Sequence, residues 1–171
     1  MKKTNLVISA LSTYLLVSLL PTTAIAQTKV KYALMPNEGF LYKDGQTYPL
    51  APSLTQGIAI AHKWGSYGWI SEADVVSPFT QANPSLQLVV GPVYFPIDKI
   101  FLVPNGSVRY NPEQKGGKVD SLSLGVGFVI GFAVSKEISF GAGLGAMKVV
   151  SGEPGPWCFA IGPKMSYTLP F

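Results

Sequence analysis

The residue types that most often carry catalysis or bind metals are scarce in this chain. Its 171 residues include one histidine, His62, and one cysteine, Cys158. A catalytic nucleophile needs a base within hydrogen-bond reach, and a metal site needs several His, Cys, Asp or Glu ligands at suitable spacing. Neither pattern surrounds these two residues. We therefore expect no catalytic residue, no metal and no cofactor, and we interpret His62 and Cys158 as structural side chains.

A glycine-rich stretch, 141–146, matches the nucleotide-binding pattern G-x-G-x-x-A. That pattern signals a phosphate loop only where a helix follows the glycines directly. Here the alternation of a strand continues instead, before Ser-Gly-Glu-Pro-Gly-Pro at 151–156. The pattern therefore favours small residues that line a strand.

Alternation of large apolar and small residues is the main signal of the chain. In 119–134 seven apolar residues from Leu122 to Val134 occupy the even positions, and Ser, Gly and Ala occupy most odd ones. The segments 138–149 and 157–171 show the same period of two. A period of two predicts β-strands, and the three residues 135–137 between the first two segments predict a tight hairpin.

Weaker alternation runs through the rest of the chain. A helix over 53–64 competes with one of these strands, and Asn105-Gly106 indicates a break or bulge inside another. Connections alternate between short turns at 65–67, 97–98 and 135–137 and longer ones at 36–53, 78–84, 111–118 and 150–156. The eight expected strands are 29–35, 54–64, 68–77, 85–96, 99–110, 119–134, 138–149 and 157–171.

The composition indicates where such strands reside. The chain is 47% hydrophobic and 13% charged, whereas about a quarter of the residues in soluble domains are charged. A soluble β-sandwich would place Lys, Glu and Thr on its second face, but here that face is Gly, Ala and Ser. Small residues suit the interior of a narrow barrel. We predict an all-β fold, an eight-stranded antiparallel up-and-down transmembrane β-barrel.

The first 26 residues have the pattern of a cleaved secretory signal peptide. Lys2 and Lys3 precede an apolar run, and Ala24-Ile-Ala26 supplies small residues at the cleavage position. A retained membrane anchor is the alternative. Cleavage leaves a single barrel domain, 27–171, and lowers the net charge from +4 to +2, because both removed charges are lysines. We therefore expect no nucleic-acid partner.

With these features the chain resembles small bacterial outer-membrane β-barrels of the OmpA, OmpX or OmpW type. The resemblance includes the C-terminal pattern Lys164-x-Ser166-x-x-Leu169-x-Phe171, with Ser166 where glycine is usual and an uncommon Pro170. It implies that this pattern is an assembly signal read by the barrel-assembly machinery. It also implies a monomer in the outer membrane, in contact with its lipid and lipopolysaccharide. Five aromatic residues near the short turns are expected to form an interfacial girdle: Trp64, Tyr67, Trp69, Tyr94 and Phe95.

The charged residues opposite the apolar faces are expected to lie in the lumen. A buried charge must be paired or hydrated, so these residues predict an internal ion-pair network that closes the barrel. The expected lumen charges are Lys29, Lys31, Lys63, Glu72, Asp74, Arg109 and Lys164.

Three roles follow from this arrangement. We favour a closed barrel with a structural or surface-interaction role. The first alternative is a narrow channel for small or hydrophobic solutes. The second is a lipid-modifying enzyme, a chemistry found among barrels of this size that uses serine, histidine and an acid. The expected position of His62, near a short turn and on the lipid face, argues against that enzyme.

Overall fold

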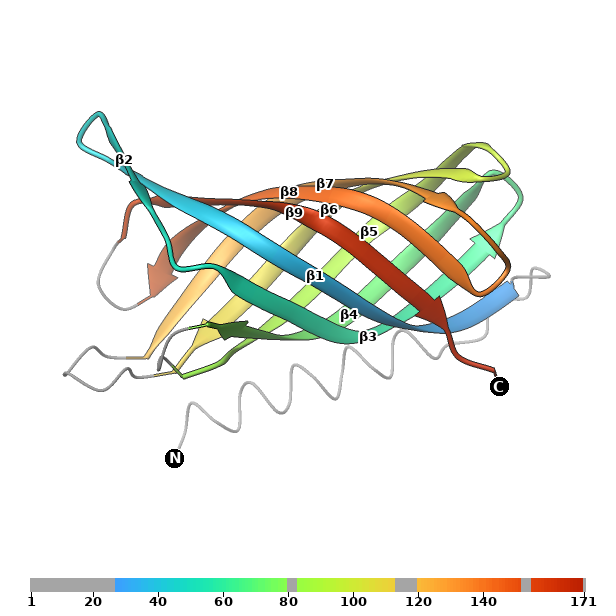
Figure 1. Cartoon of the computed structure of the whole chain (residues 1–171), viewed down its shortest axis with the longest axis horizontal. Helices are drawn as coiled ribbons and strands as arrows, with labels where there is room; N and C mark the ends of the chain where they lie inside the picture. Colours follow the sequence, from blue (N-terminus) through green and yellow to red (C-terminus); the bar gives the residue numbers. More distant parts are fainter. Residues whose placement is uncertain (1–26, 80–82, 113–119, 152–154, 171) are drawn as a thin grey trace.

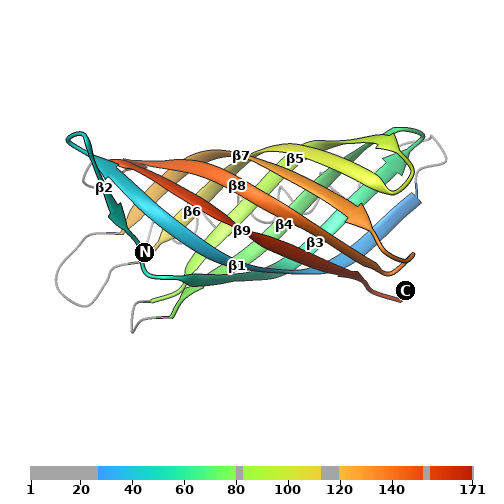
Figure 2. The same cartoon turned by 45° about the horizontal axis from the view of Figure 1, so that its top comes forward.

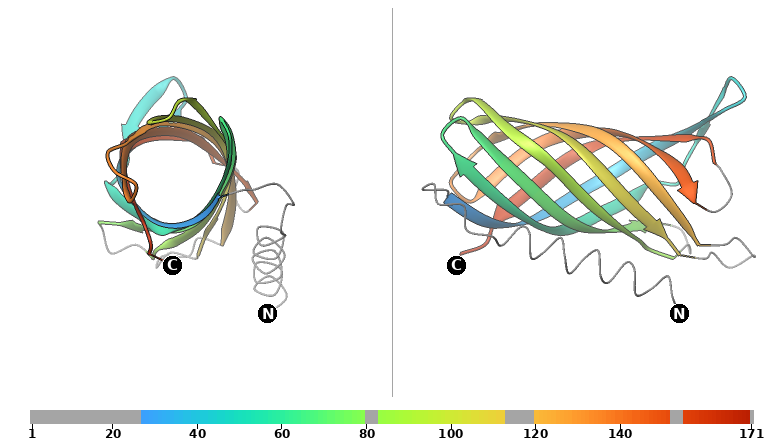
Figure 3. Two further views of the ribbon diagram at one scale, coloured as in Figure 1. Left: turned by 90° about the vertical axis from the view of Figure 1, so that its right-hand side faces the viewer. Right: turned by 180° about the vertical axis from the view of Figure 1, so that it is seen from behind.

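The computed structural model describes residues 27–79, 83–112, 120–151 and 155–170. Eight antiparallel strands form a sheet that closes on itself through pairing of the first strand with the last, and the end-on view in Figure 3 shows the closed ring. The predicted all-β, up-and-down barrel is confirmed. Its strands are β1 (Gln27–Lys43), β3 (Ser53–Trp64), β4 (Tyr67–Pro78), β5 (Ser85–Ile97), β6 (Ile100–Asn111), β7 (Ser121–Ala133), β8 (Ile138–Ser151) and β9 (Trp157–Thr168).

The two ends of the barrel differ in how the strands are connected. Tight turns join β3 to β4, β5 to β6 and β7 to β8 at one end, which we call the turn end. The start of β1 and the end of β9 lie at that end (Figure 1). The other end, the loop end, carries the longer connections and a hairpin of β1 with the short strand β2 (Gln46–Pro49), which projects beyond the other strands (Figures 1 and 2). No helix among the described residues is long and apolar enough to cross a membrane.

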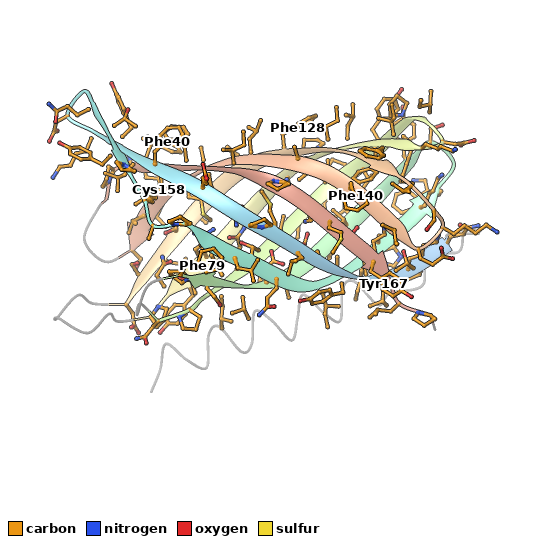
Figure 4. The ribbon with its side chains drawn as sticks, viewed as in Figure 1. Phe40, Phe79, Phe128, Phe140, Cys158 and Tyr167 are labelled. Carbon is orange, nitrogen blue, oxygen red and sulfur yellow. The ribbon has the colours of Figure 1, made fainter. Side chains whose placement is uncertain are left out.

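Alternation sorts the side chains between the two faces of the wall. Large apolar residues point outward, so that Val126, Ile130 and Leu144 are 65%, 51% and 58% exposed. Outward-facing side chains such as Phe40 and Phe128 are visible in Figure 4. The buried apolar residues are small and lie inside, for example Ala33, Ala59 and Val103, as expected for a narrow barrel that its own side chains fill. Residues 53–64 form a strand, not the competing helix.

The structure of residues 36–50 contradicts the connection predicted for 36–53. They were expected to be a connection after a strand that ends at Met35, but β1 continues to Lys43, turns at Asp44-Gly45 and returns as β2. Asp44 and Gly45 both have positive φ, the backbone that a tight hairpin of this kind requires. Pro36 conceals the longer strand, because proline normally ends a central strand.

The expected break at Asn105-Gly106 is absent, since β6 runs continuously through both residues. Pairing with β5 is nevertheless interrupted directly before Gly106, because Pro104 and Asn105 have no partner on β5. The β5–β6 ladder contains a gap in which the residues are not paired. The register is the same on both sides of this gap, and it places Pro92 opposite Pro104. A further shift of register follows between Tyr94 and Ile97.

A second gap of the same kind lies in the β1–β9 ladder, where the register places Pro36 opposite Pro163. In an antiparallel ladder, alternate residue pairs exchange two N–H···O bonds, and proline has no N–H to donate. Each facing pair of prolines therefore removes two hydrogen bonds from the wall. The backbones approach closely here, since a Cβ on Gly162 would overlap the Pro36 carbonyl oxygen, and one on Gly91 that of Pro104.

These two gaps divide the barrel into equal halves. Strands β1, β3, β4 and β5 lie between the gaps on one side, and β6, β7, β8 and β9 on the other. We call the two lines of contact the proline seams. Asn37 and Asn105, each one residue after a seam proline, donate to the carbonyl oxygen two residues earlier in the chain, at 3.0 and 3.2 Å. The two seams thus share a local structure.

Candidate functional site in the lumen

The lumen contains two cavities stacked along the barrel. The turn-end cavity has a volume of about 490 Å³, and the loop-end cavity about 160 Å³. All seven charged residues expected in the lumen line one or both of them. Lys29, Lys31 and Lys63 line the turn-end cavity, and Asp74 and Arg109 the loop-end cavity.

Six residues line both cavities where the two meet, and we call this set the partition. Glu72 and Lys164 are the charged members, Asn105 is the polar one, and the rest are apolar. The complete set is Ala33, Glu72, Val89, Asn105, Val129 and Lys164. The partition is therefore a single layer of side chains, built from opposite walls of the barrel.

An ion pair spans this layer. The Lys164 ammonium donates to a Glu72 carboxylate oxygen, Oε2, at 2.5 Å. Glu72 is 2% exposed and the Lys164 side chain 19%. Because the pair is shielded from water, each charge depends on the other: removal of one partner leaves an uncompensated charge in the lumen.

A second polar contact lies on the loop side of the ion pair. Arg109 on β6 donates two hydrogen bonds, from Nε at 2.9 Å and Nη2 at 2.6 Å, to the side-chain oxygen of Gln87 on β5. Asp74 is buried nearby, and its Oδ1 has no hydrogen-bond partner in the described part of the chain. Glu72–Lys164 joins β4 to β9 and Gln87–Arg109 joins β5 to β6, so both contacts connect one half of the barrel to the other.

The remaining expected lumen charges are not brought into ion pairs with any described residue. The Lys31 ammonium donates to the Ser139 hydroxyl at 3.4 Å and lies 5.9 Å from the centroid of the Phe101 ring. The Lys63 ammonium lies 4.4 Å from the ring centroid of Phe95. Phe95 therefore lines the turn-end cavity and does not belong to the outer girdle in which it was expected. Its odd position in β5 places it on the inner face.

The other aromatic residues expected near the turns do face outward. Trp64, Tyr67, Trp69 and Tyr94 are all exposed, and the rings of Tyr67 and Tyr94 pack with their centroids 5.3 Å apart.

The other residues singled out in the sequence lie apart from the partition. The Thr28 hydroxyl contacts His62 Nδ1 at 3.0 Å, at the turn end. Cys158 is half-buried and lines the loop-end cavity. No group of three His, Cys, Asp or Glu residues within the described ranges is arranged to hold a metal ion.

Of the C-terminal pattern, Ser166 contacts Ser139 through the two hydroxyls at 2.7 Å. The Leu169 amide donates to the Val30 carbonyl oxygen at 2.8 Å. Phe171 lies outside the described residues. Whether the pattern directs assembly stays a prediction.

Three uncharged polar residues belong to the lumen in addition to the charged set expected from the sequence. Gln87, Asn105 and Ser139 lie on the inner faces of β5, β6 and β8. Their signal was available in the alternation, because each occupies the same parity as the small or charged residues of its strand. An uncharged side chain does not require a partner of opposite charge, so its residue type alone does not predict a contact in the lumen.

Comparisons with known proteins find similarity in structure alone. No protein-family model and no curated protein matches the chain. The barrel is similar to Neisserial surface protein A, with a TM-score of 0.56, 9% identity, and coverage of 84% of this chain and 99% of that one. It is also similar to Ail, the attachment invasion locus protein of Yersinia pestis, with a TM-score of 0.57, 10% identity, and coverage of 84% and 99%. The closed antiparallel sheet and these similarities together show that the chain has the fold of the small eight-stranded outer-membrane β-barrels of the OmpA/OmpX kind.

Proposed function

We propose that this protein resides in a bacterial outer membrane as a closed barrel with a structural or surface-interaction role. The secretory pattern of residues 1–26 and the apolar outer face support this location. Strands can cross lipid only in a closed barrel, because every backbone polar group must find a partner within the sheet. The turn end then faces the periplasm, since outer-membrane barrels have short periplasmic turns and longer outer loops.

We infer closure of the lumen from the partition. Glu72 and Lys164 meet across it at 2.5 Å, with Asp74, Arg109 and Gln87 directly beyond. A solute would have to separate this ion pair and then pass the Gln87–Arg109 contact. An eight-stranded barrel is narrow enough for its own side chains to fill.

The surface-interaction role rests on the β1–β2 hairpin at the loop end. Phe40, Tyr42, Tyr48 and Leu50 are all exposed on or beside it, and the hairpin projects past the neighbouring strands (Figure 2). Exposed aromatic side chains are frequent at protein interfaces. In the membrane orientation proposed above, this hairpin extends toward the outside of the cell.

A narrow channel is the second candidate, favoured by the cavities on both sides of the partition. Only one layer of side chains separates 490 Å³ on the turn side from 160 Å³ on the loop side. Displacement of Glu72 or Lys164 would join the two spaces. We propose no catalytic role, because His62 lies at the end assigned to the periplasm, whereas modification of outer-leaflet lipid needs a site at the loop end.

Planar-bilayer recording distinguishes the closed barrel from the channel. We expect no steady conductance from the unmodified protein. Glu72→Ala combined with Lys164→Ala removes both charges together, so that neither remains unpaired, and is expected to produce discrete conductance steps. Glu38→Gln, which changes a carboxylate on the outer face, is the matched control and should remain silent.

Two results would contradict closure by the ion pair. Steady conductance of the unmodified protein that changes on Glu72 or Arg109 substitution would establish the channel instead. A silent Glu72→Ala/Lys164→Ala barrel, folded by its gel migration, would assign closure to the apolar residues Ala33, Val89 and Val129.

A further inference from the structure

The turn-end cavity has more positive charge than its own residues neutralise. Lys31 and Lys164 enter it at depth, and Lys29 lies two residues closer to the mouth on the same face of β1. Glu72 is the carboxylate at that depth, and it is bound to Lys164. Within the described part of the chain, Lys29 and Lys31 have no ion-pair partner.

The mouth of the cavity does not supply the missing negative charge to these lysines. Asp98 and Glu137 line the rim, but so do Lys63, Lys99 and Lys136. The two rim carboxylates are exposed residues of the turns, where water screens them. The rim is therefore balanced or slightly basic, and the deeper lysines remain the unneutralised charges.

The walls between the lysines are apolar. Val89, Val93, Phe101 and Val103 come from β5 and β6, and Ile70 from β4. Small-molecule sites are commonly 300–1,000 Å³ in volume, mostly apolar, with a few placed polar groups. The volume of about 490 Å³ and this lining meet that description. The cavity opens between the turns, so a ligand approaches from the turn end.

We propose that the turn-end cavity is a binding site for a small amphiphilic anion. Its carboxylate or phosphate group lies against the ammonium groups of Lys31 and Lys29, and its apolar body lies along the valines and Phe101. An anion there gains charge-assisted hydrogen bonds in a shielded space, and its apolar part leaves water. This site goes beyond the closed-barrel function and does not depend on it, because the cavity is present whether or not the lumen conducts.

Lys31 is the residue with which to test the site. Its replacement by methionine keeps a similar apolar stem and removes only the charge. Ser139, which accepts from Lys31, keeps its contact with Ser166 at 2.7 Å, and no described carboxylate loses an ion-pair partner. The variant is therefore expected to fold. Lys43→Met, at the far tip of the β1–β2 hairpin, is the matched control.

The experiment is calorimetric titration of the full barrel in nanodiscs of zwitterionic lipid, with empty nanodiscs as the blank. Octanoate is the probe, and octanamide is its neutral isostere. We expect one octanoate bound per barrel, at least tenfold weaker binding of octanamide, and at least a tenfold loss in Lys31→Met. Lys43→Met should bind octanoate as the unmodified protein does.

A second variant tests the location without a change of charge. Val93→Phe fills the cavity wall and should also weaken octanoate binding at least tenfold. Absence of octanoate binding, equal binding of octanamide, or unchanged affinity in both Lys31→Met and Val93→Phe would overturn the proposal. The titration does not measure conductance. Its result therefore tests the binding site whether or not the lumen is closed.

Discussion

At the scale of single residues, two neighbouring carboxylates of β4 have different surroundings. Glu72 and Asp74 share the inner face and are both buried. Glu72 binds Lys164, whereas Asp74 has one oxygen without a hydrogen-bond partner among the described residues. A buried polar atom without a partner costs free energy, commonly about 1–3 kcal/mol. The two positions should therefore respond oppositely to the same chemical change.

We expect Asp74→Asn to raise the free energy of unfolding by about 1 kcal/mol, because an uncharged amide removes the repulsion between the Asp74 and Glu72 carboxylates in a space shielded from water. Glu72→Gln should lower it by about 3 kcal/mol, because it leaves the Lys164 ammonium unpaired. Urea unfolding in lipid, followed by tryptophan fluorescence, measures both. An equal loss in the two variants would show that Asp74 is held by a partner as firmly as Glu72.

At the scale of the strands, the proline seams are the places where the wall has fewest hydrogen bonds. Pro36 faces Pro163 between β1 and β9, and Pro92 faces Pro104 between β5 and β6. All other adjacent strands are joined without a proline pair. The two seams lie on opposite sides of the barrel, and the Glu72–Lys164 and Gln87–Arg109 contacts tie the halves together across them.

We expect Pro36→Val with Pro163→Val to restore two ladder hydrogen bonds and to stabilise the barrel by about 1–3 kcal/mol. Before substitution, the amides of Leu34 and Ile161 beside the gap should exchange with solvent deuterium faster than those of Phe128 and Leu144 in the middle of the β7–β8 ladder. The double variant should slow the exchange of the first two amides only. Equal exchange rates in the unmodified protein would show that the gap does not loosen the wall.

At the scale of the whole molecule, the outer face is the property that decides where the protein can reside. Twenty-seven large hydrophobic residues are exposed on the described part of the chain. In a soluble protein such an apolar surface would be an aggregation liability, whereas the lipid of a membrane would cover it. The closed sheet leaves no strand edge within the barrel wall exposed to lipid.

We expect the protein to fractionate with the outer membrane and to migrate differently on SDS gels before and after heating, because a folded barrel resists the detergent until heated. Both properties are measured on the same membrane preparation. Recovery in the soluble periplasmic fraction, with one migration regardless of heating, would contradict the proposed location.

Much of the architecture was determined by the sequence, because a period of two can be detected in the residues themselves. The alternation from Leu122 to Val134 and in 157–171 predicted strands and their two faces. It could not predict the length of β1. Proline normally ends a central strand, and only the tertiary structure shows that β1 continues past Pro36 with a gap in its ladder opposite Pro163.

Only the tertiary structure decided which lumen residues meet. Lys164 and Glu72 are 92 positions apart in the chain, and the stagger of strands around a closed barrel brings them together. The same closure left Lys31 beside Ser139 and Phe101 without a carboxylate. Alternation determines on which face a side chain lies, since that depends on its own strand. Its position along the barrel axis and its partners depend on the register of every strand that separates it from those partners. The local pattern of residues does not contain that register.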